Sequence, residues 1–149
     1  MTPSRAQAAV VRAPQTFLSF DYGRKRTGVA SGNRVFGQAT PLTTVTAEGD
    51  ARFERIARLI AEWQPDALVV GVPRHPDGAP HENTRLAQRF ARQLHGRFRL
   101  PVFEVDERYS TTEVLAAGAR DADAAAAALL LEQYFNESDR AALAAKEQT

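Results

Sequence analysis

The sequence predicts an α/β fold in which three antiparallel strands come first and alternating helices and strands follow, forming a mixed sheet with helices against its faces. Three observations lead to this prediction. Three β-type runs separated by short turns occupy the first third of the chain. From Asp50 onward, segments of helical periodicity alternate with short apolar runs. One of these runs, Ala67–Val72, is apolar at both odd and even positions, which is typical of a strand covered on both faces.

The three N-terminal strands are predicted from residue type and turn chemistry. Thr16–Asp21 is rich in β-branched and aromatic residues and forms the first strand. Thr27–Ser31 and Phe36–Val45 form the next two, separated by a Gly-Asn turn signal. Pro41 has no backbone N–H to donate, so the third strand is predicted to be broken or to lie at an edge of the sheet.

The helices and later strands follow from periodicity. Asp50–Trp63 is predicted to be helical because apolar residues recur at steps of three and four. The same spacing predicts a helix over about His81–Phe98, and Leu100–Val105 follows as a strand. A short helix is predicted from Ser110 to about Ala117. A final alanine-rich helix begins at Asp121 or Ala122 and ends at Phe135.

Length and composition predict one domain. The 149 residues are 44% hydrophobic and 25% charged, which is ordinary for a globular protein long enough to bury a core. The domain is predicted to span residues 16–137, with a disordered N-terminal tail at 1–15 and a C-terminal tail at 138–149. No apolar stretch approaches the roughly 20 residues of a membrane-spanning helix, so a cytoplasmic protein without a membrane partner is expected.

Charge and cysteine content narrow the possible functions. The formal net charge is +1, so nucleic-acid binding would depend on local basic clusters rather than on a field over the whole molecule. The sequence contains no cysteine, which excludes disulfides, thiolate zinc sites and cysteine nucleophiles.

The clearest local cluster follows the first strand. Asp21 ends that strand, and Arg24, Lys25 and Arg26 follow in a turn that begins with Gly23. A carboxylate in this position can hold a divalent cation, and the basic side chains can contact phosphate oxygens. An aspartate close before a glycine also commonly binds its own backbone in a turn, so this segment alone leaves both interpretations open.

Two further acids lie at the ends of predicted elements. Glu107 comes just after the last strand, and Asp123 lies at the start of the last helix. At about 100° per residue, Asp123 shares the sheet-facing stripe of that helix, whereas Asp121 projects to the other side and suits a capping role. Each acid also has an ordinary explanation: Asp123 as a favourable charge at a helix N-terminus, and Glu107 as an ion-pair partner of Arg108.

Two other clusters are weaker signals. Arginines are frequent in and just after the second predicted helix. They could contact successive phosphates of a nucleic acid, but such a run more often forms a solvated helix face. They are Arg85, Arg89, Arg92, Arg97 and Arg99. His75, Asp77 and His81 could bind a metal, but polar loops with two histidines are commonly inert, and this interpretation is favoured.

Several motifs, taken in order, resemble the YqgF family. The first are Phe20-Asp21-Tyr22-Gly23 with Gly28-Val29-Ala30, and Val69-Val70-Gly71-Val72-Pro73 with Asp77-Gly78. The others are Asp106-Glu107-Arg108-Tyr109-Ser110-Thr111-Thr112 and Asp123-Ala124-Ala125-Ala126. The resemblance covers about residues 16–135 and implies a ribonuclease-H-like fold related to Holliday junction resolvases. It also implies a nuclease that matures the 5′ end of pre-16S ribosomal RNA.

The resemblance implies that Asp21, Glu107 and Asp123 are catalytic acids that bind one or two Mg²⁺ or Mn²⁺ ions. Arg24, Lys25, Arg26 and Arg108 are then expected to contact substrate phosphates. The expected substrate is structured RNA, namely precursor ribosomal RNA.

Two alternatives stay open. One is a resolvase acting on branched DNA, and the other is a non-catalytic nucleic-acid-binding factor in ribosome assembly. The loop before Asp123 is shorter than the family pattern, which favours the second alternative slightly.

Overall fold

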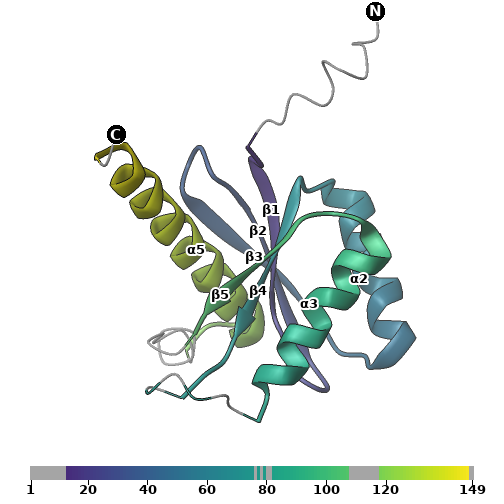
Figure 1. Ribbon diagram of the computed structural model, residues 1–149. Helices are drawn as coiled ribbons and strands as arrows, with labels where there is room; N and C mark the ends of the chain where they lie inside the picture. Colours follow the sequence, from purple (N-terminus) through teal and green to yellow (C-terminus); the bar gives the residue numbers. More distant parts are fainter. Residues whose placement is uncertain (1–12, 76, 78, 80–81, 108–117, 148–149) are drawn as a thin grey trace, which may run out of the picture.

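The fold is a five-stranded mixed sheet with helices on both faces (Figure 1). The computed structural model describes residues 13–75, 77, 79, 82–107 and 118–147. The strands are β1 (Thr16–Asp21), β2 (Thr27–Asn33), β3 (Gln38–Val45), β4 (Ala67–Val72) and β5 (Val102–Asp106). The helices are α2 (Gly49–Trp63), α3 (Thr84–Phe98) and α5 (Ala122–Glu147).

The strand order is β3-β2-β1-β4-β5. β1 pairs antiparallel with β2, and β2 pairs antiparallel with β3, whereas β4 is parallel to both β1 and β5. All six residues of β4 are buried. The predicted mixed sheet, with three antiparallel strands before the alternating units, is therefore confirmed.

Pro41 lies where its chemistry requires. It belongs to β3, which is the edge strand beside β2. The register shifts there, because Val29 pairs with Thr43 while Ala30 pairs with Pro41. The prediction that this strand is broken or lies at an edge is confirmed for the edge position, although β3 begins at Gln38 rather than at Phe36. The turn occupies residues 34–37, so the turn predicted at Gly32-Asn33 is wrong, and these two residues belong to β2.

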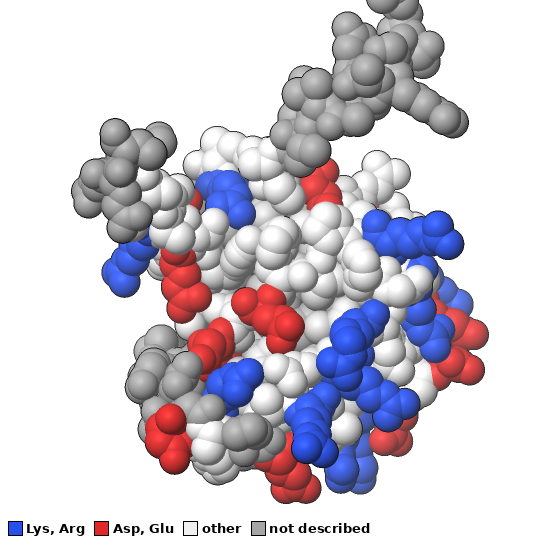
Figure 2. All heavy atoms as spheres, in the orientation of Figure 1, with Lys and Arg blue, Asp and Glu red and all other residues white. Residues whose placement is uncertain are grey.

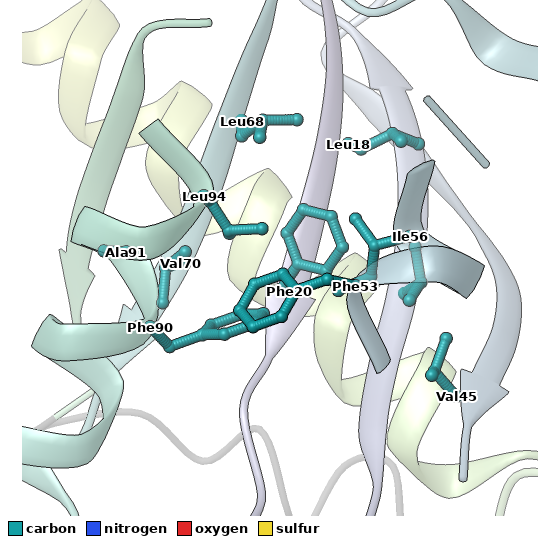
Figure 3. Close-up of a cluster of buried hydrophobic side chains, with 11 residues drawn as sticks. Leu18, Phe20, Val45, Phe53, Ile56, Leu68, Val70, Phe90, Ala91 and Leu94 are labelled. Atoms are coloured by element: carbon teal, nitrogen blue, oxygen red, sulfur yellow. The ribbon is translucent and has the colours of Figure 1, made fainter. Parts of the chain in front are cut away.

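Two apolar clusters hold the helices on opposite faces. Leu18 and Phe20 of β1 point to the face covered by α2 and α3, where Ile56, Phe90 and neighbouring side chains close the core (Figure 3). Phe17, which precedes Leu18 in the alternation, points to the other face. There its ring contacts the rings of Tyr134 and Phe135 in α5 at centroid distances of 5.7 and 5.2 Å.

The C-terminal helix is longer than its apolar pattern predicts. α5 continues to Glu147, so the predicted end of this helix at Phe135 is wrong. The buried stripe does end at Phe135, but contacts continue beyond it: Arg34 donates to Ser138 Oγ at 2.7 Å and lies 3.8 Å from Asp139. The alanine-rich segment that follows has high helix propensity of its own.

Some predictions fall outside the described residues. They concern residues 1–12 of the N-terminal tail, the helix from Ser110 to about Ala117, and the first residue of the helix predicted from His81. Within the described part of the chain, no helix has the length and apolar character needed to cross a bilayer.

Gly28 permits the closest approach between α5 and the sheet. A Cβ atom at this position would lie 1.8 Å from the carbonyl oxygen of Asp123, a contact with backbone that no side-chain rotation relieves. Gly28 pairs with Asp21 across the β1–β2 ladder. The absence of a side chain at Gly28 therefore brings the first turn of α5 close to the end of β1.

We predict that Gly28→Ala lowers the free energy of unfolding by at least about 1–3 kcal/mol, the usual range for overpacking a close-packed site. Gly96→Ala is the matched control, because a Cβ there has no atom within 4 Å and α3 gains helix propensity. Urea unfolding of both variants measures the difference. A Gly28→Ala protein as stable as the parent would contradict the close packing.

Candidate functional site

A hollow of about 480 Å³ lies where β1 ends and α5 begins. Its lining is Asp21, Tyr22, Gly23, Arg24, Lys25, Arg26 and Asp123. The structure thus brings two of the three predicted acids and three of the four predicted phosphate contacts to one place. Arg108, the fourth, lies outside the described residues.

Asp21 lies on the strand face that α5 covers. Side chains alternate along β1, so Phe17, Ser19 and Asp21 share a face. Phe17 packs on α5, and the Ser19 hydroxyl donates to the carbonyl of Ala127 at 2.7 Å. Ala127 is one helical turn beyond Asp123, which places the end of β1 beside the first turn of the helix.

Asp121 and Asp123 have separate roles in that first turn. Asp121 Oδ1 accepts hydrogen bonds from the Ala124 N–H at 3.1 Å and from the Thr44 hydroxyl at 2.5 Å. The predicted capping role of Asp121 is therefore confirmed. Asp123 faces the hollow, where its carboxylate lies 3.3 Å from Arg26 Nε. Its side chain is 32% exposed, so solvent reaches the ion pair.

Glu107 follows β5, and one strand, β4, separates it from Asp21 at the end of β1. Its N–H donates to the Val72 carbonyl at 3.1 Å, which continues the pairing of β5 with β4. Its carboxylate covers Gly71, where an added Cβ would lie 2.7 Å from Glu107 Oε1 and 2.6 Å from Leu130 of α5. Gly71 follows Val70, the β4 partner of Phe20. Glu107 is therefore on the α5 face, at the same end of the sheet as Asp21.

The three acids share a face and an end of the sheet without forming a tight cluster. Within the described residues, no group of three His, Cys, Asp or Glu side chains is spaced to hold a metal ion. Carboxylate oxygens are nonetheless the donors that Mg²⁺ and Mn²⁺ prefer, so the donor set fits such ions by its chemistry. Metal binding by Asp21, Glu107 and Asp123 stays a prediction.

Arg52 of α2 supports the basic turn from the other face of the sheet. The residue is only 5% exposed, and its guanidinium donates to the Ala47 carbonyl at 2.9 Å and to the Arg24 carbonyl. The guanidinium also lies 4.9 Å from the centroid of the Tyr22 ring. Buried donors need such acceptors, and here the acceptors are the backbone of the turn and of the segment before α2.

Sequence reasoning missed this role for Arg52. The available signal was its position four residues before Ile56, which puts it on the buried stripe of α2 rather than on the solvated face. The three basic residues that the turn presents, Arg24, Lys25 and Arg26, are themselves exposed at the rim of the hollow. Arg52 thus fixes the backbone from which these side chains project.

Comparison with known proteins identifies the family. A family model described as "RuvX: Holliday junction resolvase" matches residues 15–137. The chain belongs to the RuvX family. A protein of Albidiferax ferrireducens named "Putative pre-16S rRNA nuclease" is 69% identical over 121 residues, covering 81% of this chain and 78% of its own length. A Polaromonas protein of the same name is 67% identical over 121 residues, covering 81% and 88%.

The RuvX assignment confirms the resemblance seen in the sequence motifs and agrees with the fold. RuvC of T. thermophilus, solved in complex with a Holliday junction substrate, superposes with a TM-score of 0.51 at 18% identity. The match covers 83% of this chain and 95% of that one. At this identity the likeness concerns the fold alone. RuvC-like resolvases have the ribonuclease-H-like fold, so the predicted fold class is confirmed.

We predict that Arg52→Met lowers the free energy of unfolding by about 1–3 kcal/mol, because two partly buried hydrogen bonds from its guanidinium are lost. Arg52→Lys should recover only part of this stability, because the single ammonium of lysine cannot reach both carbonyl oxygens as the forked guanidinium does. Arg55→Met, at an exposed position of α2, is the control and should change stability by less than about 0.5 kcal/mol. Equal stabilities of Arg52→Met and Arg55→Met in chemical unfolding would contradict the role of Arg52.

Proposed function

We propose that this RuvX protein is a divalent-metal-dependent endonuclease that hydrolyses phosphodiester bonds of structured RNA. The proposed substrate is the 5′ end of pre-16S ribosomal RNA, and the proposed setting is ribosome biogenesis in the cytoplasm. The observation that carries this proposal is the hollow that Asp21 and Asp123 line together with exposed basic side chains. The names of the close relatives support the choice of substrate.

The acids would perform the chemistry. Asp21, Glu107 and Asp123 would hold one or two Mg²⁺ or Mn²⁺ ions at the shared end of β1, β5 and α5. Such ions, when bound, supply Lewis-acid stabilisation of the attacking and leaving oxygens of a phosphodiester. The approach of all three carboxylates to a common ion requires side-chain adjustment, chiefly of Glu107, which in the structure lies over Gly71.

The basic rim would bind the substrate. Arg24, Lys25 and Arg26 are exposed at the hollow and would neutralise phosphate charge, together with Arg108. Arg26 is 3.3 Å from Asp123 in the structure. When a phosphate and a cation enter, Arg26 would exchange the carboxylate for a phosphate oxygen and leave Asp123 to the cation. The ion pair thereby keeps both side chains in the hollow before substrate arrives.

Two other functions have a specific observation in their favour. The family description names a Holliday junction resolvase, which favours branched DNA as the substrate. The spacing of the acids in the described residues, with no cluster of three ready for a metal, favours a binding factor without catalysis. The same cleavage experiment separates all three functions.

We predict that Asp21→Asn and Glu107→Gln each reduce metal-dependent cleavage at least about 100-fold, because losing a ligand forfeits several kcal/mol of transition-state stabilisation. Glu104→Gln, on the exposed part of β5, removes one carboxylate outside the site and is the control. Cleavage is measured on end-labelled precursor RNA and on a four-way DNA junction, in Mg²⁺ and in Mn²⁺, at one fixed salt concentration.

The outcomes assign the function. Faster cleavage of the RNA, abolished in both acid variants, supports the proposal. Preferential cleavage of the junction identifies a resolvase instead. Binding of RNA without cleavage in either metal, unaffected by Asp21→Asn, identifies a non-catalytic factor. Full activity in Asp21→Asn would show that Asp21 is not part of the active site.

A further inference from the structure

α3 presents a row of arginines to solvent. Arg85, Arg89 and Arg92 are spaced at four and three residues, so they project from one side of the helix. All three are exposed, whereas Phe90 and Leu94 on the opposite side are buried in the core. Figure 2 shows Lys and Arg side chains gathered on the side of the molecule that carries α3 in Figure 1. We call Arg85, Arg89 and Arg92 the arginine stripe.

The arginine stripe has no acidic partner in the part of the chain that the structure describes. The ion pairs found there join Arg26 to Asp123, Arg34 to Asp139 and Arg97 to Asp50. Arg97, on the same helix, is thus paired with a carboxylate of α2, whereas no carboxylate among the described residues forms an ion pair with the stripe. Its charge is available to a partner.

This arrangement opposes the stability of α3 itself. Like charges four residues apart on a helix repel each other, as Arg85 and Arg89 do. The first turn of α3 contains no acid and holds Arg85, although the partial positive charge of a helix N-terminus favours an anion there. An anionic partner would relieve both penalties.

The chemistry of the stripe suits phosphate. Guanidinium groups bind phosphate oxygens through paired N–H donors, and successive phosphates of a nucleic acid offer such acceptors at regular intervals. A protein partner would be expected to meet exposed aromatic or large aliphatic side chains. The exposed large hydrophobic residues of the described chain lie on other elements: Val35, Phe36, Trp63, Phe103 and Leu143.

The helix that carries the stripe contacts a residue of the functional site. Tyr22 lines the hollow, and its ring lies 4.9 Å from the ring of Phe90 in α3. Phe90 is on the buried side of α3, so the helix that presents the stripe to solvent also supports Tyr22 from the core. At a rise of 1.5 Å per residue, the stripe spans about 10 Å of the helix.

We propose that Arg85, Arg89 and Arg92 bind the phosphate backbone of the nucleic acid outside the cleavage hollow, so that affinity depends on substrate length. The inference rests on the proposed function for the choice of partner. It adds a second contact surface, which recognises charge rather than sequence. Because phosphates are common to RNA and DNA, the stripe contributes equally to both.

The test is the salt dependence of binding by the full-length protein. The probes are a fluorescently labelled stem-loop RNA, a DNA hairpin of the same sequence and a short RNA that covers only the cleavage region. Binding is titrated without divalent metal at several KCl concentrations. Each arginine that no longer meets a phosphate reduces the magnitude of the slope of log K against log salt by about 0.7–0.9. The triple variant Arg85→Gln/Arg89→Gln/Arg92→Gln should therefore reduce it by about 2.1–2.7 on both long probes.

Single variants provide the matched control. Arg89→Gln should reduce the slope by about 0.7–0.9, whereas Arg140→Gln, which removes one exposed charge from the C-terminal half of α5, should leave it unchanged. The parent should bind the long RNA more tightly than the short one, and the triple variant should lose this preference. If the triple variant fails to fold, as judged by circular dichroism, the three single variants decide.

Two results would overturn the inference: a parental slope in the stripe variants, or an equal reduction in Arg140→Gln. Failure of the proposed nuclease function has a different signature, because it appears as cleavage unaffected by Asp21→Asn. The metal-free binding measurement decides the role of the stripe in either case.

Discussion

The close contact between the first turn of α5 and β2 determines the geometry of the whole site. Gly28 has no side chain, so the backbone of Asp123 can pack directly on the strand. Small residues continue this fit, since Ala127 and Ala128 of α5 pack against Ala30 of β2. The hydroxyl of Ser19 fixes the distance between β1 and α5, because it donates a hydrogen bond to the Ala127 carbonyl of the helix. Asp123 shares the hollow with Asp21 because the helix cannot sit farther away without losing these contacts.

The opposite face of the sheet restrains the other half of the hollow. There the buried guanidinium of Arg52 binds the Arg24 carbonyl and lies over Tyr22, which in turn packs on Phe90. The basic turn is therefore connected to α2 and α3, whereas the acids belong to the α5 side. A substrate phosphate entering the hollow would meet cations and carboxylates that are positioned by different parts of the core, so each set can be altered separately.

The sequence predicted those features that depend on local pattern. Residue type identified the strands, the missing N–H of Pro41 placed β3 at an edge, and helical angles separated the capping role of Asp121 from the sheet-facing position of Asp123. These results depend on neighbours within a few residues. The family resemblance then implied the roles of the acids, and the structure brings Asp21 and Asp123 to one hollow.

Features that depend on distant contacts could not be predicted in this way. The part of α5 beyond Phe135 is contacted by Arg34, more than a hundred residues earlier in the chain, at Ser138 and Asp139. The burial of Arg52 follows from carbonyls of two loops whose approach only the folded sheet produces. The spacing between Glu107 and Asp21 is set by β4, which lies between their strands. Each of these features depends on how the helices and strands are placed relative to one another, and the periodicity of the sequence does not predict that placement.

The positions of the charged side chains in the structure explain how a chain of small net charge could bind a nucleic acid. A formal charge of +1 provides little long-range attraction for a polyanion, yet exposed cations gather in the basic turn and in the arginine stripe of α3, the helix whose Phe90 packs against Tyr22 of the hollow. Binding by such local clusters is sensitive to salt and indifferent to base sequence. Discrimination among nucleic acids would then have to come from shape, through the requirement that one substrate reach the hollow and α3 together. This requirement favours a structured, branched or folded nucleic acid over a short single strand, whichever sugar its backbone contains.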